Sequence, residues 1–158
     1  MAARATGKGG IMRRLSLAGV CLKSALVLLG GNGTSAMAST SVPVTIQSTV
    51  IVGPFTGTWS ATGGISDSGT LVEPSVNFVG NRQLHIVRDV TGSQGTFTLR
   101  IDSTALPKPD GSVDFTGQWV VIAGTGAYSD LHGQGTRNAV LNTSGVVTET
   151  LTSSVHYD

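Results

Sequence analysis

One glycine-rich stretch carries most of the architectural information: Gly124-Thr125-Gly126-Ala127-Tyr128-Ser129-Asp130-Leu131-His132-Gly133-Gln134-Gly135-Thr136. The residues before it, 119–123, are apolar on both faces and are typical of a buried strand. Because glycine tolerates sharp backbone turns, we expect the chain to leave this strand at once and to carry Tyr128 and Leu131 inward. Gly133 and Gly135 then begin the next strand.

On both sides of this stretch, polar and apolar residues alternate with a period of two. In residues 55–62 every second position is Thr or Ser, and residues 96–102, 114–123 and 147–155 follow the same pattern. Alternation of this kind predicts half-buried β-strands. The abundance of Thr, Ser, Val and Gly, with no helical period, supports an all-β fold, since β-branched residues suit a pleated sheet.

Turn residues divide the chain into about eight strands, at 42–52, 55–65, 69–78, 83–90, 95–102, 113–123, 134–141 and 146–156. The breaks between them contain Gly, Pro, Asn and Asp, as in an antiparallel meander. Eight strands can close into a barrel, which removes exposed edges. A two-sheet sandwich fits the periodicity almost as well.

The first 38 residues read as an export leader. They hold five basic residues and no acidic one; the first four precede the apolar run 15–29, and Ala36-Met37-Ala38 follows that run. This order is typical of a secretory signal peptide, with cleavage after Ala38 and translation from Met1 or Met12. The apolar run is short and contains Lys23, so we expect no stable membrane anchor. The mature domain is then 39–158, and its expected location is extracellular.

Removing the leader changes the charge of the protein. Residues 39–158 hold five basic and nine acidic residues, a formal charge of −4, and no cysteine. Scattered arginines do not form the basic stripe that phosphate contacts require, so we expect no nucleic-acid partner. We also expect no cofactor, and no disulfide to hold the domain together.

The strand–turn–strand unit of residues 119–136 resembles the signature of the allene oxide cyclase-like barrel family, which is related to the plant dirigent proteins. Residues 55–59 and 96–101 are similar to segments of bacterial secreted members, and the resemblance covers most of 55–156. It implies an eight-stranded antiparallel, calycin-like barrel with an apolar interior. It also makes a homo-oligomer possible, as in plant relatives.

The resemblance does not carry the plant cyclase chemistry with it. That chemistry places a glutamate on the first strand and a cysteine on a later one, whereas residues 42–65 here contain no carboxylate and the mature domain has no cysteine. Dirigent proteins use aspartates and an arginine. Asp67, Asp89, Asp102, Arg88 and Arg100 are present, but none can be matched to a dirigent position.

Three polar residues are the best candidates for catalysis. Glu149 is in phase with Val147 and Leu151, and Arg88 is in phase with apolar residues of its own strand. A charge facing a barrel interior must be paired or hydrated, which predicts a buried ion pair or a polar contact for a ligand. A β-bulge would instead turn these charges outward. Tyr128 is either a packing plug or a catalytic acid.

Five aromatic residues share inward phases and are candidates for a ligand pocket: Phe55, Trp59, Phe97, Phe115 and Trp119. They could equally fill a narrow barrel. His85, His132 and His156 are far apart in the sequence, with no carboxylate at metal-ligand spacing, so we expect no metal site.

These observations favour a secreted protein that binds a small apolar molecule in or at the barrel mouth. A cyclase or dirigent-type enzyme, which would steer cyclisation or coupling of a reactive intermediate, is the alternative. A structural extracellular protein with a filled barrel is the third.

Overall fold

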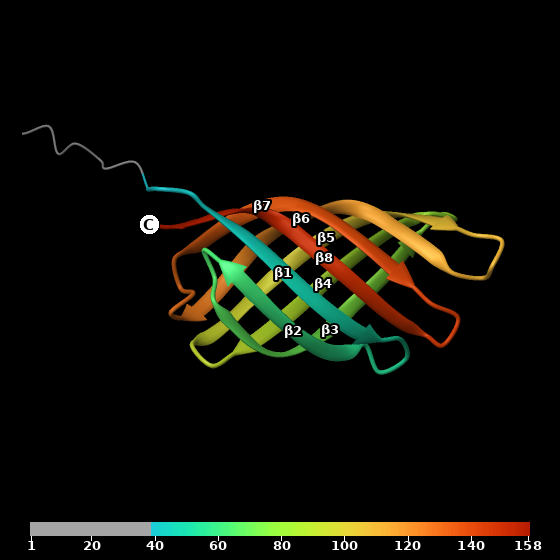
Figure 1. Cartoon of the computed structure of the whole chain (residues 1–158), viewed down its shortest axis with the longest axis horizontal. Helices are drawn as coiled ribbons and strands as arrows, with labels where there is room; N and C mark the ends of the chain where they lie inside the picture. The colour runs from blue at the N-terminus through green and yellow to red at the C-terminus, as the bar shows by residue number, and fades with distance from the viewer. Residues whose placement is uncertain (1–38) are drawn as a thin grey trace, which may run out of the picture. The chain divides into compact units, whose positions relative to one another are not determined.

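The computed structural model describes residues 39–158, so the predicted signal peptide and its cleavage site lie outside the described residues. The described part is all β (Figure 1). Its eight strands are β1 (Val42–Ile51), β2 (Thr56–Gly63), β3 (Asp67–Val79), β4 (Gln83–Gly92), β5 (Gly95–Pro107), β6 (Val113–Gly126), β7 (Leu131–Leu141) and β8 (Val146–Tyr157). None of residues 39–158 forms a helix long and apolar enough to cross a membrane.

The strands form one closed antiparallel barrel in which each strand pairs with its neighbour in sequence and β8 pairs with β1. The prediction of a barrel rather than a sandwich is therefore confirmed. The β2–β3, β4–β5 and β6–β7 turns lie at one end, with the start of β1 and the end of β8, to the left in Figure 1. The other four turns lie at the opposite end.

Alternation along the strands separates the interior from the surface as the sequence predicts. In β5, Phe97, Leu99 and Ile101 are at most 1 % exposed, whereas Thr and charged residues alternate with them on the outside. Two irregularities interrupt the ladders, one between Val72 and Ser75 of β3 and one opposite Thr98 and Leu99 of β5. The register of β8 with both its neighbours is continuous.

The observed strands differ from the predicted ones mainly at their ends, and β6 runs to Gly126, three residues beyond its predicted end at residue 123. β5 continues to Pro107, five residues beyond the prediction, and β7 begins at Leu131 rather than at residue 134. Phe55 was predicted to begin a strand, but it lies in the β1–β2 turn with a φ of 51°. Its carbonyl accepts a hydrogen bond from the Glu73 amide at 2.8 Å, which holds the turn against β3.

The end of the barrel that contains the β6–β7 turn is tied together by Asp67, and we call it the capped end. The Asp67 carboxylate accepts hydrogen bonds from the Tyr128 hydroxyl at 2.7 Å and from the Ser93 hydroxyl at 2.7 Å. It also accepts the Ser68 and Gln94 amides. One side chain at the start of β3 therefore links the β4–β5 and β6–β7 turns.

Candidate functional site

Two of the predicted candidates, Arg88 and Glu149, face the barrel interior. Both side chains are buried, although β3 has its irregularity opposite Arg88, so the alternative that a bulge turns these charges outward is wrong. Arg88 is 1 % exposed and lies between the buried residues Ile86 and Val90 of β4. Glu149 is 5 % exposed and lies between Val147 and Leu151 of β8.

Arg88 is held by two carboxylates. Its Nη2 contacts Glu73 Oε1 at 2.5 Å and its Nε donates to the same oxygen at 3.1 Å. Its Nη1 donates to Glu149 Oε1, and also to the Ser48 hydroxyl at 3.3 Å. All three nitrogens of the guanidinium are thus engaged, as a buried arginine requires.

Glu149 in turn lies between two arginines. Its Oε1 accepts from Arg88 and from the Ser48 hydroxyl, and its Oε2 accepts from Arg137 Nε at 2.6 Å. Arg137 also donates to the Ser103 hydroxyl at 3.0 Å, and its guanidinium lies over the Phe115 ring at 5.5 Å from the centroid. The four charged residues form an alternating chain with no net charge, which we call the lumen ion chain: Glu73, Arg88, Glu149 and Arg137.

The electrostatics of the lumen ion chain favour the ionised states of Glu149 and Arg88. Burial alone would raise the pKa of Glu149, but the charges of Arg88 and Arg137 and the hydrogen bonds to it outweigh burial and lower that pKa to about 2. Burial would lower the pKa of Arg88, but Glu149 and Glu73 outweigh it and raise that pKa. Glu149 is therefore a carboxylate at neutral pH, with both oxygens occupied, and it has no proton to donate as a general acid.

Arg137 and Glu73 were missed by the sequence reasoning. Arg137 is 2 % exposed and is in phase with Ala139 and Leu141 of β7, which is the same signal that pointed to Glu149. Glu73 follows Leu71 in phase, but the irregularity at Val72 and Ser75 interrupts the alternation immediately afterwards. Arg137 could have been found from its phase in the strand, whereas Glu73 could not.

Tyr128 is placed as a plug rather than as a free acid. It is 2 % exposed, packs edge-to-face on Phe97 at 5.2 Å, and donates a hydrogen bond from its hydroxyl to Asp67. Burial and the Asp67 carboxylate raise the pKa of Tyr128, and the Tyr128 hydroxyl is the largest cause that lowers the pKa of Asp67. The hydroxyl thus holds the capped end together.

Four of the five predicted aromatic residues do face inward, and they pack within the barrel. Trp59 and Phe97 meet edge-to-face at 5.3 Å, and the Trp59 indole donates to the Thr91 carbonyl at 3.0 Å. Trp119 is 2 % exposed and donates to the Thr136 carbonyl, and Phe115 is 5 % exposed beneath Arg137. The fifth, Phe55, is half-buried in its turn.

Exposed hydrophobic residues gather at the end opposite the capped end, beside polar turn residues such as Arg82 and Asp110. Of the ten exposed large hydrophobic residues in 39–158, seven lie in or beside its turns, and we call them the apolar rim: Ile51, Val52, Val72, Phe78, Val79, Leu106 and Val140. Phe78 is 64 % exposed and Leu106 is 56 % exposed. Three inward residues near the same end, Val76, Val113 and Leu141, are only partly buried, so the core itself reaches solvent here.

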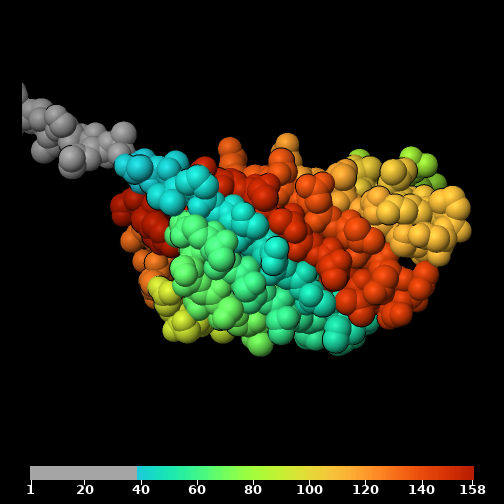
Figure 2. Space-filling model, in the orientation of Figure 1, coloured from blue at the N-terminus to red at the C-terminus, as the bar shows by residue number. Residues whose placement is uncertain are grey.

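The outer face of the barrel carries a groove of about 870 Å³ across β2, β1, β8, β7 and β6. Figure 2 views the molecule onto the outer face of β1, β2 and β8. The outward residues that line the groove are mostly uncharged, with one ion pair, Lys108–Asp114, at 2.6 Å. In β1, β2, β7 and β8 the only Asp, Glu, Lys or Arg residues are Arg137 and Glu149, and both are buried.

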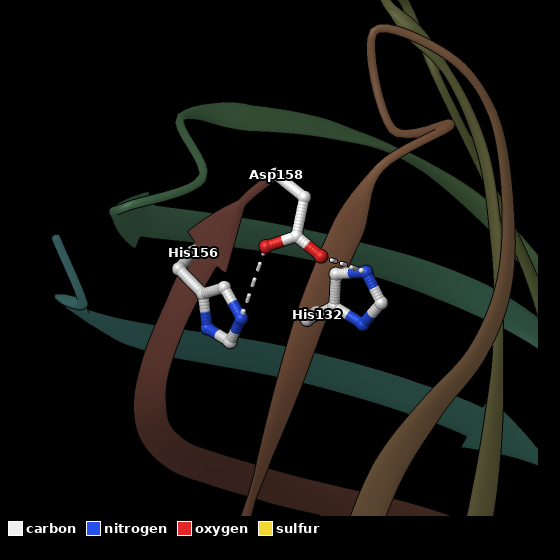
Figure 3. Close-up of side chains that lie close together, drawn as sticks. All are labelled: His132, His156 and Asp158. Carbon is white, nitrogen blue, oxygen red and sulfur yellow. Dashed lines mark ion pairs between the residues drawn. The ribbon is translucent and has the colours of Figure 1, made fainter. Parts of the chain in front are cut away.

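Two of the three histidines are brought together by the β7–β8 register, which pairs His132 with His156. The two rings are nearly parallel with centroids 5.3 Å apart, and the Asp158 carboxylate lies between them (Figure 3). The spacing in sequence, from which we expected no metal site, does not reveal this proximity, since the antiparallel β7–β8 pairing aligns residues that are distant in sequence. His85 also has a carboxylate neighbour, Asp102, at 2.5 Å.

No protein-family model, curated protein or solved structure matches this chain. The chemistry of the barrel's own residues therefore carries the functional inference.

Proposed function

We propose that this chain is a secreted binding protein, of the allene oxide cyclase-like barrel type, that holds a small apolar molecule at the apolar rim of its barrel. The proposal rests on one asymmetry. Hydrogen bonds to the Asp67 carboxylate close the capped end, whereas exposed and partly buried hydrophobic side chains meet solvent at the other end. Clustered exposed apolar surface of this kind is typical of a binding site.

The lumen ion chain favours binding over turnover. Both oxygens of Glu149 and all three nitrogens of Arg88 are engaged with other residues of the chain. A cyclase or dirigent-type reaction would need one of these groups to reach the bound molecule. Because its charged groups pair with one another, the lumen ion chain lies beneath a ligand bound at the apolar rim. There the ion chain fixes the shape of the barrel.

The proposal is tested by titrating the purified chain with the neutral apolar dye N-phenyl-1-naphthylamine and following its fluorescence. We expect saturable enhancement, reversed by a long-chain alcohol. Phe78→Ser and Val79→Ser should each weaken binding about tenfold, since a buried Phe or Val side chain contributes roughly 1.5–3 kcal/mol.

The matched control is Ile122→Ser, which removes a side chain that is also exposed, at 51 %, but lies outside the apolar rim. It should bind the dye as the parent does. Absence of saturable binding in the parent would support the structural alternative of a filled barrel. Equal loss in Ile122→Ser and Phe78→Ser would show that the dye binds exposed apolar surface without regard to the rim.

Secretion is tested separately by intact-mass measurement of the exported protein. A measured mass equal to that of residues 39–158 supports cleavage after Ala38. A mass that includes residues 1–38 would overturn the proposed extracellular location.

A further inference from the structure

We infer that His132, His156 and Asp158 form a surface binding site for a divalent transition-metal ion such as Zn²⁺. The site lies beside the capped end, where β7 begins and β8 ends. It is separate from the apolar rim, so it is independent of the proposed function.

The distances between the ligand atoms suit a small metal ion. His132 Nε2 lies 3.1 Å from Asp158 Oδ2, and His156 Nε2 lies 3.7 Å from Asp158 Oδ1. The ligand atoms of the three residues all lie within 4.8 Å of one another. Tetrahedral bonds of about 2.0–2.2 Å to nitrogen and oxygen place neighbouring ligand atoms roughly 3.3–3.5 Å apart, between the two observed separations.

Small movements of side chains would complete the site. The carboxylate points one oxygen at each ring, so that a metal ion would take the place of the two ring contacts (Figure 3). His132 and Asp158 side chains are 54 % and 64 % exposed and are free to rotate, while the backbone is held by the β7–β8 ladder. The Asp158 amide also donates to the Asp130 carbonyl at 3.3 Å, which fixes the approach of Asp158.

The donor set determines which ions bind. Two imidazoles and one carboxylate suit Zn²⁺, Cu²⁺ and Ni²⁺, whereas Mg²⁺ and Ca²⁺ prefer oxygen ligands. Three protein ligands leave a fourth position for water. Because the ion would link the neighbouring strands β7 and β8, binding should also raise the thermal midpoint of unfolding.

The test is isothermal titration calorimetry of the purified chain, carrying no polyhistidine tag, with Zn²⁺ and with Mg²⁺. We expect one Zn²⁺ per chain and no saturable heat with Mg²⁺. His132→Gln and His156→Gln should each weaken Zn²⁺ binding at least tenfold, and Asp158→Asn should weaken it measurably.

The matched control is His85→Gln, which breaks another exposed histidine–carboxylate pair, His85–Asp102, at a position away from the site. It should leave Zn²⁺ binding and the Zn²⁺-induced rise in Tm unchanged. Circular dichroism of each variant checks folding, which these exposed substitutions should preserve. Unchanged binding in His132→Gln, or equal loss in His85→Gln, would overturn the proposal.

Discussion

Glu149 is a charged side chain in an apolar barrel, and its neighbours make that placement tolerable. It lies between two guanidinium groups and accepts a hydrogen bond from the Ser48 hydroxyl, so each of its oxygens is satisfied. The desolvation penalty of a buried charge is offset by its partners, whereas a buried charge that loses a partner is strongly destabilising. The energy of this arrangement is best measured by breaking it at its centre.

Replacing Glu149 with Gln keeps the shape of the side chain but leaves Arg88 and Arg137 without their shared carboxylate. We expect the free energy of unfolding to fall by about 3–5 kcal/mol. Urea denaturation followed by tryptophan fluorescence would measure it. The control is Asp102→Asn, which breaks surface ion pairs and should cost at most about 1 kcal/mol. If the free energy of unfolding fell by the same amount in the two variants, the lumen ion chain would contribute no more than a surface ion pair.

The same residue predicts how stability depends on pH. Because the pKa of Glu149 is lowered to about 2 in the folded protein, its contribution is fully present above the unfolded pKa of about 4.3 and is lost as the pH falls toward 2. The difference corresponds to roughly 3 kcal/mol. Urea midpoints measured from pH 7 to pH 2 should therefore fall less steeply in Glu149→Gln than in the parent. The pKa values of Asp67 and Asp110 are also lowered, so protonation of these two residues in acid destabilises the parent and Glu149→Gln alike. Parallel curves would contradict the prediction.

At the scale of strands and turns, the alternation of Thr with apolar residues predicted most of what is observed. Every predicted strand exists, because large apolar residues at alternate positions, such as Phe97 and Leu99, must all face the barrel interior. The end of β5 was missed because Ser103 is a polar residue at an inward position, where its hydroxyl accepts a hydrogen bond from Arg137. The His132–His156 pair could not be seen before the β7–β8 register was known.

Prolines mark the limits of the strands in the same way. Pro43 is the second residue of β1, Pro74 lies at the irregularity of β3, and Pro107 ends β5. Pro54 and Pro109 lie in turns. A proline lacks the amide proton that a ladder needs, so each lies where a strand begins, bends or ends.

The β6–β7 turn is held by one hydroxyl, and Tyr128→Phe isolates its contribution. The ring would keep its contact with Phe97, but the hydrogen bond to the Asp67 carboxylate would be lost. We expect a loss of about 1.5–3 kcal/mol in the free energy of unfolding, since the bond is charge-assisted. Tyr157→Phe is the control, because Tyr157 is 40 % exposed and should tolerate the change. If both variants match the parent in urea, the turn does not depend on this bond.

Closure of the barrel is a property of the whole molecule, because it joins β1 to β8 across nearly the whole described chain. The direction of the backbone groups of β1 shows how this seam is made. The Pro43 carbonyl accepts the Gly64 amide, toward β2, while the Val52 amide donates to the Gly145 carbonyl, on the β8 side. Backbone groups of successive strand residues point to opposite sides, so the amides of Val44, Ile46 and Val50 point toward β8.

Hydrogen exchange measured by NMR can therefore test closure residue by residue. In a closed barrel the Ile46 and Val50 amides are protected by β8, and their exchange should be slowed at least about a thousandfold, as for the interior amides of β5. In a sheet open between β1 and β8 the same amides would lie at a free edge and exchange as fast as the turn amide of Gly53. Protection of odd-numbered amides such as Gln47, which point toward β2, is expected in either arrangement and serves as the internal control. Fast exchange at Ile46 and Val50 beside slow exchange at Gln47 would show that the eight strands do not close.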